Sequence, residues 1–412
     1  MTPTIIILLG GLALMLIGFG LLGTLLGVRG TIASFSNIET GLVMSGYYVG
    51  YVIGTVIVPR IIRNVAHIRT FAALAAVAAA TTLSFGLVVH PLVWLVLRIV
   101  SGLSIVGLYM VVESWLNEQS AGPVRGRIFS IYMMSTLFAL GTGQFLLLLG
   151  DSTELTPFAI AAITMSLGVL PVAVTRVAEP RIELVVPVRI AELMRISPLG
   201  TVGVLVAGAI NGAFWGMTPV FAQRLTLAEM EIALLMSTTI FGGAVLQWPI
   251  GHLSDRFDRR HVLIFVSLTT AAVAASLAFI VTNGNYHGLL LASCLYGGLM
   301  FSLYGISVAH TNDHLAHGQV LETTRALLLI FGVGALSGPL LGGIAMDVIG
   351  LVGLHVLSAV IAASLALYGI YRMTQRIAPP LDEQTGFVPL VRTTPVVLEM
   401  LPDAERKPGL SE

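Results

Sequence analysis

Long apolar stretches, separated by short polar segments, follow one another along almost the whole sequence. An α-helix rises about 1.5 Å per residue, so about 20 apolar residues cross the roughly 30 Å hydrocarbon core of a bilayer. We therefore predict an all-α membrane protein whose twelve transmembrane helices are the long stretches that are nearly free of charge. These stretches run approximately over 5–27, 40–58, 70–89, 91–115, 128–149, 157–175, 198–222, 232–250, 262–282, 288–309, 326–346 and 348–371.

The arginines between the stretches predict the orientation of the protein, because cytoplasmic loops carry Lys and Arg in excess. Only Arg29 and Arg224 fall on one side of the predicted membrane. We expect the other side, with both chain termini, to be cytoplasmic. The arginines on that side are Arg60, Arg63, Arg69, Arg125, Arg127, Arg176, Arg181, Arg189, Arg195, Arg256, Arg259, Arg260 and Arg325.

The longest connection between predicted spans divides the chain into two halves. We predict a six-helix bundle over 1–176, a cytoplasmic linker over 177–197 and a second six-helix bundle over 198–371. The remaining segment, 372–412, is rich in proline and mixed charge and has little helical periodicity, so we predict a flexible cytoplasmic tail. Four apolar residues in it are candidates for docking on the protein or the lipid surface: Val396, Val397, Leu398 and Leu401.

Composition excludes several classes of function. The chain is 56% hydrophobic and 10% charged, its mean hydropathy is +0.94, and its net charge is zero, so no basic excess is available to attract nucleic acid. Its one lysine, Lys407, is followed by proline, so a Walker A loop for nucleotide is absent. Cys294 is the single cysteine, which excludes an intrachain disulfide and a cysteine metal cluster. We predict neither a cofactor nor a metal, and no nucleotide-driven transport.

A charged decapeptide between the eighth and ninth predicted spans is the most distinctive motif: Gly251-His-Leu-Ser-Asp255-Arg256-Phe-Asp258-Arg259-Arg260. Asp255 can cap a nearby helix start or pair with Arg256 or Arg259, and a purely topological anchor is the alternative. The decapeptide resembles the loop signature of the major facilitator superfamily, Gly-x-x-x-Asp-Arg-x-Gly-Arg-Arg, with Asp258 in place of the second glycine. The resemblance implies a solute carrier that alternates between inward-open and outward-open states. The gating candidates in this loop are Gly251, Asp255, Arg256, Arg259 and Arg260.

The two predicted halves share weak internal matches. A shift of 192 residues places Met44-Ser45 on Met236-Ser237 and Gly50 on Gly242, and a shift of 195 places Gly102 on Gly297. Such a duplication is typical of transporters with parallel repeats and a substrate site near the midplane between them. The shift of 192 also brings Pro59-Arg60-Ile-Ile-Arg63 to the place of the loop motif, so Arg60 and Arg63 are further gating candidates.

A longer pattern in the first half resembles the bacterial YcaD-like branch of the superfamily, and it implies a multi-pass protein of the bacterial inner membrane. The matching residues are Pro59-Arg60-Ile-Ile-Arg63, His67-Ile-Arg69, Arg98, Gly102, Tyr109, Glu113-Ser-Trp-Leu-Asn117 and Arg125-Gly-Arg127.

Arg98 is the only arginine well inside a predicted span. A charge at that depth is costly unless it is paired, hydrated or able to reach the membrane surface, so it marks a candidate functional site. The spacing to Gly102 resembles the fourth-helix motif of the superfamily, in which such an arginine faces the central cavity. We expect an anion contact or a modulator of proton relay; the alternative is an outward-reaching side chain or a tie to Glu39.

Glu113 is the only carboxylate inside a predicted span. It is therefore a candidate for proton coupling. We favour instead an ion pair with Arg60 or Arg63 that latches one conformational state, because an interfacial pair breaks easily when helices rock. Glu113 would then be a gating residue.

Gly338 and Pro339 lie in a run, Gly334 to Gly343, that matches Gly-x-x-x-Gly-Pro-x-x-Gly-Gly. Antiporters of the superfamily that this chain resembles have such a run in their fifth span, whereas here it falls in the eleventh. We therefore interpret it as close packing and flexure and do not infer antiport.

The resemblance also implies that the first, fourth, seventh and tenth spans line the cavity. The remaining candidates for the substrate pathway are Tyr109, Asn211, Trp215, Tyr296 and Tyr304. Ordinary packing and hydrogen bonding between helices is the alternative for each of them. For His310, Asp313 and His314, at the end of the tenth span, we favour solvation over a metal site.

Our leading hypothesis is a gradient-driven carrier of a small solute, with protons as the candidate coupling ion. Glu113 is the only carboxylate in the predicted spans, which favours a neutral or anionic solute. One alternative is a flippase for a lipid or lipid-linked molecule; another is a membrane sensor or assembly factor that binds a partner through its tail. We expect no enzymatic activity, because the sequence has no recognisable nucleophile, base and acid constellation.

Overall fold

The computed structural model describes residues 3–119, 125–174, 190–315, 320–375, 384 and 386–387, which are almost entirely helical and include no strand. The N-terminal half contains α1 (Pro3–Ile32), α2 (Asn37–Val65), α3 (His67–Leu87), α4 (Pro91–Glu118), α5 (Arg125–Gly143), the 3₁₀ helix η2 (Gln144–Leu149) and α6 (Thr156–Val174). A short helix, α7 (Ile190–Ile196), precedes the C-terminal half. That half contains α8 (Pro198–Arg224), α9 (Glu229–Arg256), α10 (Arg259–Thr282), α11 (Tyr286–Asn312), α12 (Val320–Ile349) and α13 (Gly353–Met373).

The twelve-span fold predicted from the apolar stretches is confirmed. Within the described residues, 11 helical segments are long and apolar enough to cross a membrane, and α6 adds a shorter apolar helix. Several helices extend beyond the predicted apolar stretches: α2 was expected over 40–58 and continues to Val65, past Pro59 and two arginines. Backbone hydrogen bonding continues where the side chains become polar, so hydropathy underestimates helix length. The domain boundaries at 176, 197 and 371 stay a prediction.

Local sequence sets where some helices begin. Ser36 and Glu39 form a capping box at the start of α2: the Glu39 amide donates to Ser36 Oγ at 3.1 Å and the Ser36 amide donates to Glu39 Oε2 at 2.8 Å. Asp258 is the N-cap of α10, and its carboxylate accepts a hydrogen bond from the Arg260 amide at 2.9 Å. Such caps satisfy amides that have no acceptor within the helix.

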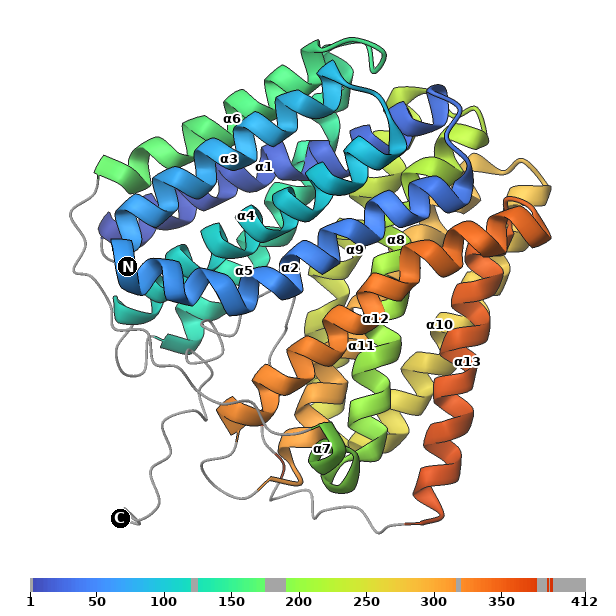
Figure 1. Cartoon of the computed structure of the whole chain (residues 1–412). Coiled ribbons are helices and arrows are strands. Elements are labelled where there is room, and N and C mark those ends of the chain that lie inside the picture. The colour runs from blue at the N-terminus through green and yellow to red at the C-terminus, as the bar shows by residue number, and fades with distance from the viewer. Residues whose placement is uncertain are drawn as a thin grey trace.

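The helices pack in the same pairs in both halves. α2 packs on α4 as α9 packs on α11, and α3 packs on α6 as α10 packs on α13. The two bundles lie at an angle to each other, with α2 of the first crossing α12 of the second (Figure 1). The internal repeat seen weakly in the sequence is thus a repeat of structure, as in transporters built from two related halves.

Matched glycines make the equivalent helix contacts. A Cβ atom at Gly50 would lie 1.8 Å from the Ile99 carbonyl oxygen, and one at Gly242 would lie 2.1 Å from the Cys294 carbonyl oxygen. In each half, therefore, a helix backbone approaches its partner more closely than any side chain would allow. The sequence match of Gly50 with Gly242 has this physical origin.

The two ends of the bundles differ in charge and in how the halves contact each other. We call the end at which α2 ends and α8 begins the arginine-rich face, because Arg60, Arg63 and Arg260 lie there. The other end is called the opposite face. Among the described residues, five hydrogen bonds join the halves at the opposite face or in the part of the bundles nearer to it. Their donors and acceptors are Asn37 and Asp347 (2.6 Å), Ser45 and Leu336 O (2.7 Å), Ser152 and Glu229 (2.5 Å), Arg224 and Phe35 O (3.0 Å), and Ser237 and Gly141 O (2.8 Å).

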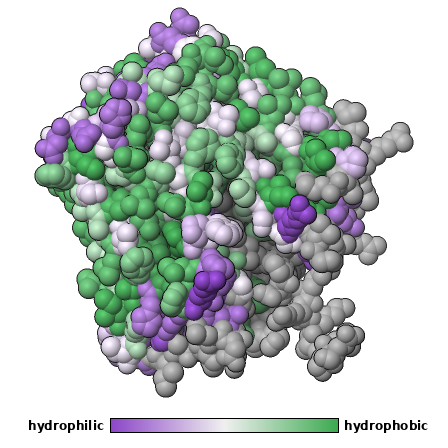
Figure 2. Space-filling view, turned by 180° about the vertical axis from the view of Figure 1, so that it is seen from behind, coloured by the Kyte–Doolittle hydropathy of each residue, from purple (hydrophilic) through white to green (hydrophobic). Residues whose placement is uncertain are grey.

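The outer surface is suited to a bilayer. Hydrophobic residues cover most of the face seen in Figure 2, and hydrophilic residues gather towards its upper and lower edges. Large exposed apolar side chains such as Trp248, Phe279 and Leu291 lie on the helices and not only in the core. In water such an apolar surface would be unfavourable. In a bilayer the surrounding acyl chains are also apolar, so the surface is stable there.

Candidate functional site

Arg98 lies inside the N-terminal half, where α4 packs against α2. Its side chain is 5% exposed, its Cζ atom lies 5.2 Å from the centre of the Tyr47 ring, and its Nη2 donates to Met44 Sδ at 3.3 Å. A guanidinium over an aromatic face gains about 0.5–2 kcal/mol, depending on desolvation. The side chain is thus directed into the protein rather than to the membrane surface. Glu39 is exposed and bonded to Ser36, so the structure does not bring it to Arg98.

Aromatic residues extend from Arg98 along α2. The Tyr47 ring lies 5.5 Å from that of Phe19 and 6.3 Å from that of Tyr51, measured between centres. Tyr51, one turn further along α2, interacts electrostatically with Glu113 of α4 and with Tyr304 of the C-terminal half. The tyrosines therefore connect the surroundings of Arg98 with those of Glu113. The sequence analysis singled out Tyr109, which belongs to this group, but missed Tyr47 and Tyr51, because nothing in their spacing marks them as different from core aromatics.

Glu113 is completely buried and accepts a hydrogen bond from the Tyr132 hydroxyl of α5 at 2.5 Å. It is 15 residues from Arg98 on α4, or about four helical turns, so both charged groups lie on the same side of the helix. The latch predicted between Glu113 and the first loop is absent from this conformation: Arg60 and Arg63 are exposed and take part in no ion pair among the described residues. They lie on the outer side of α2, whereas Glu113 points towards α5.

The C-terminal half contributes an aromatic surface. Trp215 of α8 is 9% exposed, and its ring centre lies 6.2 Å from that of Phe301 in α11. Asn211, one turn before it, donates to the Ala207 carbonyl at 2.9 Å within its own helix. Tyr304 is 3% exposed, and its hydroxyl has no hydrogen-bond partner among the residues that the structure describes. A buried hydroxyl without a partner is costly, so Tyr304 stays a candidate for binding a polar group of a ligand.

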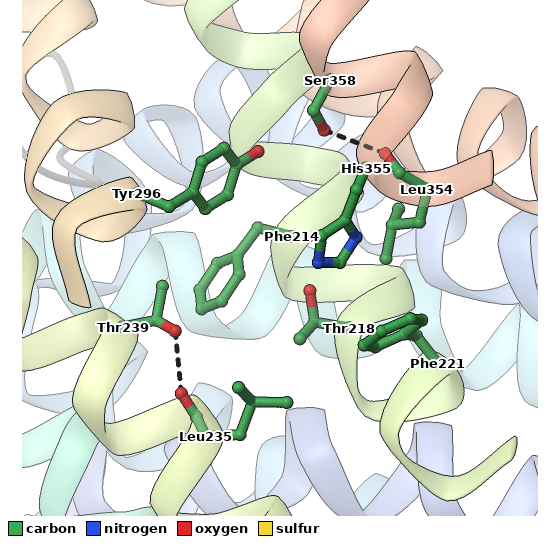
Figure 3. Close-up of a pocket in the computed structure, with 9 residues that line it drawn as sticks. All are labelled: Phe214, Thr218, Phe221, Leu235, Thr239, Tyr296, Leu354, His355 and Ser358. Atoms are coloured by element: carbon green, nitrogen blue, oxygen red, sulfur yellow. Dashed lines mark hydrogen bonds between the residues drawn. The ribbon is translucent and has the colours of Figure 1, made fainter. Parts of the chain in front are cut away.

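Tyr296 lies apart from this surface. It lines a small cavity inside the C-terminal half, together with residues of α8, α9 and α13 (Figure 3). His355 points into the same cavity, its ring centre 4.7 Å from that of Phe221, and its Nδ1 atom is buried without a hydrogen-bond partner among the described residues. The predicted placement of Tyr296 on the path between the halves is thus not seen here. Figure 3 shows its ring directed towards Phe214 and His355.

The loop motif is tied together by Arg259, which is 1% exposed. Its Nη2 bonds to Asp255 Oδ1 at 3.0 Å and its Nη1 bonds to Asp313 Oδ1 at 2.7 Å. Of the two partners considered for Asp255, the structure thus shows Arg259, while Arg256 is exposed. The solvated role favoured for Asp313 is wrong in this respect, because this carboxylate is buried against Arg259. No group of three or more potential metal ligands occurs among the described residues.

Asp258 replaces the glycine of the loop signature and takes a structural role. Burial raises the pKa of Asp258, but hydrogen bonds from the side chain and amide of Arg260 and the charge of that arginine outweigh it, so the pKa is lowered. The Arg260 Nη2 atom lies 2.7 Å from Asp258 Oδ2. The departure from the signature therefore adds a cap to α10.

A residue of the C-terminal tail contacts the same loop. The Phe387 amide donates to Asp255 Oδ1 at 2.7 Å, and a Cβ atom at Gly251 would lie 2.1 Å from the Phe387 ring. Gly251 thus provides the space that the ring occupies. The apolar tail residues predicted to dock, 396–401, lie outside the described residues.

Pro339 lies where three helices of the two halves meet. A Cβ atom added at Gly41 of α2 would lie 2.7 Å from the Pro339 carbonyl oxygen. A Cβ atom added at Gly216 of α8 would lie 2.8 Å from the Pro339 Cβ atom. A Cβ atom at Gly338 would be 2.2 Å from the Ala209 carbonyl. The run in α12 therefore allows close packing, as its small residues indicate.

Comparisons with known proteins agree with this arrangement. The family model for the Major Facilitator Superfamily matches residues 8–320 and 200–401. "Uncharacterized MFS-type transporter YcaD" of Escherichia coli is 29% identical over 345 residues, which are 82% of this chain and 87% of that protein. The protein of the same name from Escherichia fergusonii is 29% identical over 348 residues, with the same coverage.

Solved structures with a similar fold are much more distant in sequence. The nucleoside transporter NupG has a TM-score of 0.73 at 13% identity and covers 91% of this chain and 100% of its own. A bacterial homolog of the human lysosomal transporter Spinster, inward-facing and unoccupied, has a TM-score of 0.69 at 15% identity and covers 92% and 100%. At such identities the likeness shows the fold alone.

Proposed function

Because this chain belongs to the Major Facilitator Superfamily, we propose that it is a secondary transporter that moves a small neutral or anionic solute across the bacterial inner membrane by alternating access. The observations that support the proposal are one buried polar group in each half. In the N-terminal half Arg98 is held over Tyr47, and in the C-terminal half the Tyr304 hydroxyl has no hydrogen-bond partner among the described residues. A buried cation beside aromatic rings suits a solute with an anionic or polar group and an apolar body.

The contacts between the halves support a particular state. The five hydrogen bonds near the opposite face hold the halves together there, and in Figure 1 the bundles diverge towards the arginine-rich face. If the arginine-rich face is cytoplasmic, as the excess of arginine in its loops favours, this state is inward-open. Outward opening then requires the bonds of Ser45 and Ser237 to break.

Single-cysteine labelling tests this state and the orientation together. In a Cys294→Ser background, we expect a cysteine at Arg63 to react with a membrane-impermeant maleimide only in inverted vesicles, and one at Glu39 only in right-side-out vesicles. A cysteine at Ser237 should be protected from both sides until substrate is added. Reaction of the Arg63 and Glu39 positions from the same side would refute alternating access with this topology.

A proton-coupling role for Glu113 is part of the proposal. Its carboxylate is fully buried and bonded to Tyr132, so its charge state affects this contact between α4 and α5. Once a substrate is known, we expect Glu113→Gln to retain solute exchange but to lose accumulation driven by an imposed pH gradient. A variant that accumulates solute as the wild type does would remove Glu113 from coupling.

The substrate class is tested by thermal unfolding of the purified protein with a panel of metabolites. A ligand at 100 times its Kd stabilises the folded state by about 2.7 kcal/mol. We expect hits among neutral or anionic compounds, with Arg98→Gln losing the anionic ones and Arg69→Gln, an exposed arginine outside the cluster, keeping them. Hits restricted to cationic compounds, or equal binding by Arg98→Gln, would contradict the proposed class.

A further inference from the structure

A second cavity lies at the arginine-rich face of the C-terminal half, where the chain passes from α7 into α8. The cavity itself measures about 20 Å³, in a wider recess of about 320 Å³ that includes open solvent. Its polar lining consists of Ser197, Arg260, His310, His314 and Arg372. α7 and the last turn of α13, which carries Arg372, lie at the same end of this half in Figure 1. The cavity starts about 21 Å along α8 from Asn211, 14 residues away, so it is separate from the proposed substrate site.

Ser197 is the N-cap residue of α8, but its side chain makes no capping hydrogen bond. It is 2% exposed, and its Oγ atom has no hydrogen-bond partner among the described residues. An N-cap serine normally accepts a hydrogen bond from an amide of the first turn. Here the hydroxyl lines the cavity instead, beside the start of a 27-residue helix whose dipole favours an anion.

Among the residues that the structure describes, the charges around the cavity leave a positive excess. Asp258 is bonded to Arg260, and Asp313 is bonded to Arg259, so both nearby carboxylates are neutralised. Arg372, at the end of α13, takes part in no ion pair among the residues that the structure describes. An arginine in this position needs a counter-ion to reduce the cost of its partial burial.

Two histidines complete the lining. The rings of His310 and His314 are 4.8 Å apart between centres, in an edge-to-face arrangement. His314 Nδ1 lies 2.8 Å from the His310 carbonyl, so that nitrogen carries the proton in a neutral ring and acts as a donor. Imidazole, guanidinium and hydroxyl groups around one cavity are the donor set typical of a phosphate or sulfate site.

We propose that this cavity binds an oxyanion, namely the phosphate group of a free phosphate or of an anionic lipid headgroup. Ser197, Arg372 and the first amides of α8 would bind its oxygens, and Arg260 would add positive charge. Since the lining comes from the α7–α8 junction, α10, α11 and α13, the bound anion would stabilise the C-terminal half and hold the linker against it. The site does not depend on the identity of the transported solute.

The first experiment measures binding of free anion. The protein is purified in a neutral detergent without phosphate, and its thermal unfolding is followed while inorganic phosphate replaces chloride at constant ionic strength. We expect a saturable rise in the melting temperature for the wild type. Arg372→Gln and Ser197→Ala should each weaken apparent phosphate binding at least tenfold, whereas Arg372→Lys should retain part of it. Arg69→Gln removes a positive charge from the same face and should bind as the wild type does.

The second experiment distinguishes the source of the phosphate. The same variants are placed in phosphatidylcholine nanodiscs with or without phosphatidylglycerol, and lipids retained after extraction are identified by native mass spectrometry. Retention of phosphatidylglycerol by the wild type but not by Arg372→Gln indicates a headgroup site, and a response to free phosphate alone indicates a soluble ligand. Absence of both responses in the wild type, or equal responses in Arg372→Gln, would overturn the proposal. If Ser197→Ala does not fold, the comparison of Arg372→Gln with Arg372→Lys still tests the proposal, because the Arg372 side chain is partly exposed.

Discussion

Replacement of Gly102 by alanine tests how closely α4 must approach α2. A Cβ atom at Gly102 would lie 2.0 Å from the Tyr47 carbonyl oxygen, whereas ordinary van der Waals contact begins at 3.4 Å. The two backbones would therefore have to separate by about 1.4 Å, the difference of these distances. Tyr47 supports Arg98, so this separation would also displace the cation at the proposed substrate site.

The expected magnitude follows from two opposing effects. Alanine favours the helix over glycine by about 1 kcal/mol. Overpacking typically costs about 1–3 kcal/mol, and a contact with backbone, which cannot rotate away, belongs at the upper end. We therefore expect Gly102→Ala to lower the free energy of unfolding by roughly 1–2 kcal/mol net.

The assay is equilibrium unfolding in mixed detergent micelles, with Gly23→Ala of α1 as the control. No atom lies within 4 Å of a Cβ at Gly23, so only the helix-propensity gain remains and this variant should be as stable as the wild type or more stable. Gly102→Ala should also weaken binding of any anionic ligand found in the screen. If Gly102→Ala is as stable as Gly23→Ala, the close approach of α2 and α4 does not exist as described.

Three further predictions concern the loop motif and its contacts. Arg259→Gln should destabilise the protein by about 3–5 kcal/mol, because it leaves the Asp313 carboxylate buried without its cation; a loss below about 1 kcal/mol in the same assay would indicate a solvated pair. Phe387→Ala should increase labelling of a cysteine placed at Gly251, and unchanged labelling would show that the tail does not cover the loop. The lowered pKa of Asp258 contributes stability that is present above its unfolded pKa of about 3.9 and is lost as pH falls through the folded value. Asp258→Asn should therefore flatten the stability profile below about pH 5. An unaltered profile would contradict the role of this carboxylate as a cap.

The sequence predicted the arginine and glutamate of α4 as candidates but could not predict their partners. A charged residue within an apolar stretch is rare and can be recognised in the sequence without any structure, so both residues could be identified as candidates. Arg98 contacts Tyr47, 51 residues earlier, and Glu113 bonds to Tyr132 on the next helix. Which of several nearby tyrosines or arginines is the partner depends on the rotation of each helix about its axis. Hydropathy does not record that rotation when apolar residues surround the whole helix, and so the expected pairing of Glu113 with Arg60 or Arg63 was wrong for this state.

What the amino-acid order alone determined is the set of twelve helices and their duplication, because lipid permits a spanning segment only if its backbone hydrogen bonds are satisfied internally. Gly50 and Gly242 were also visible as a match, although not their contacts. The tertiary structure decided the rest: that Arg259 joins Asp255 to Asp313, that Phe387 rests on Gly251, and that Ser197 and Arg372 line one cavity although they are far apart in the chain. These groups meet only after two bundles have packed, since their distances are set by the contacts of whole helices and not by any local preference of the chain.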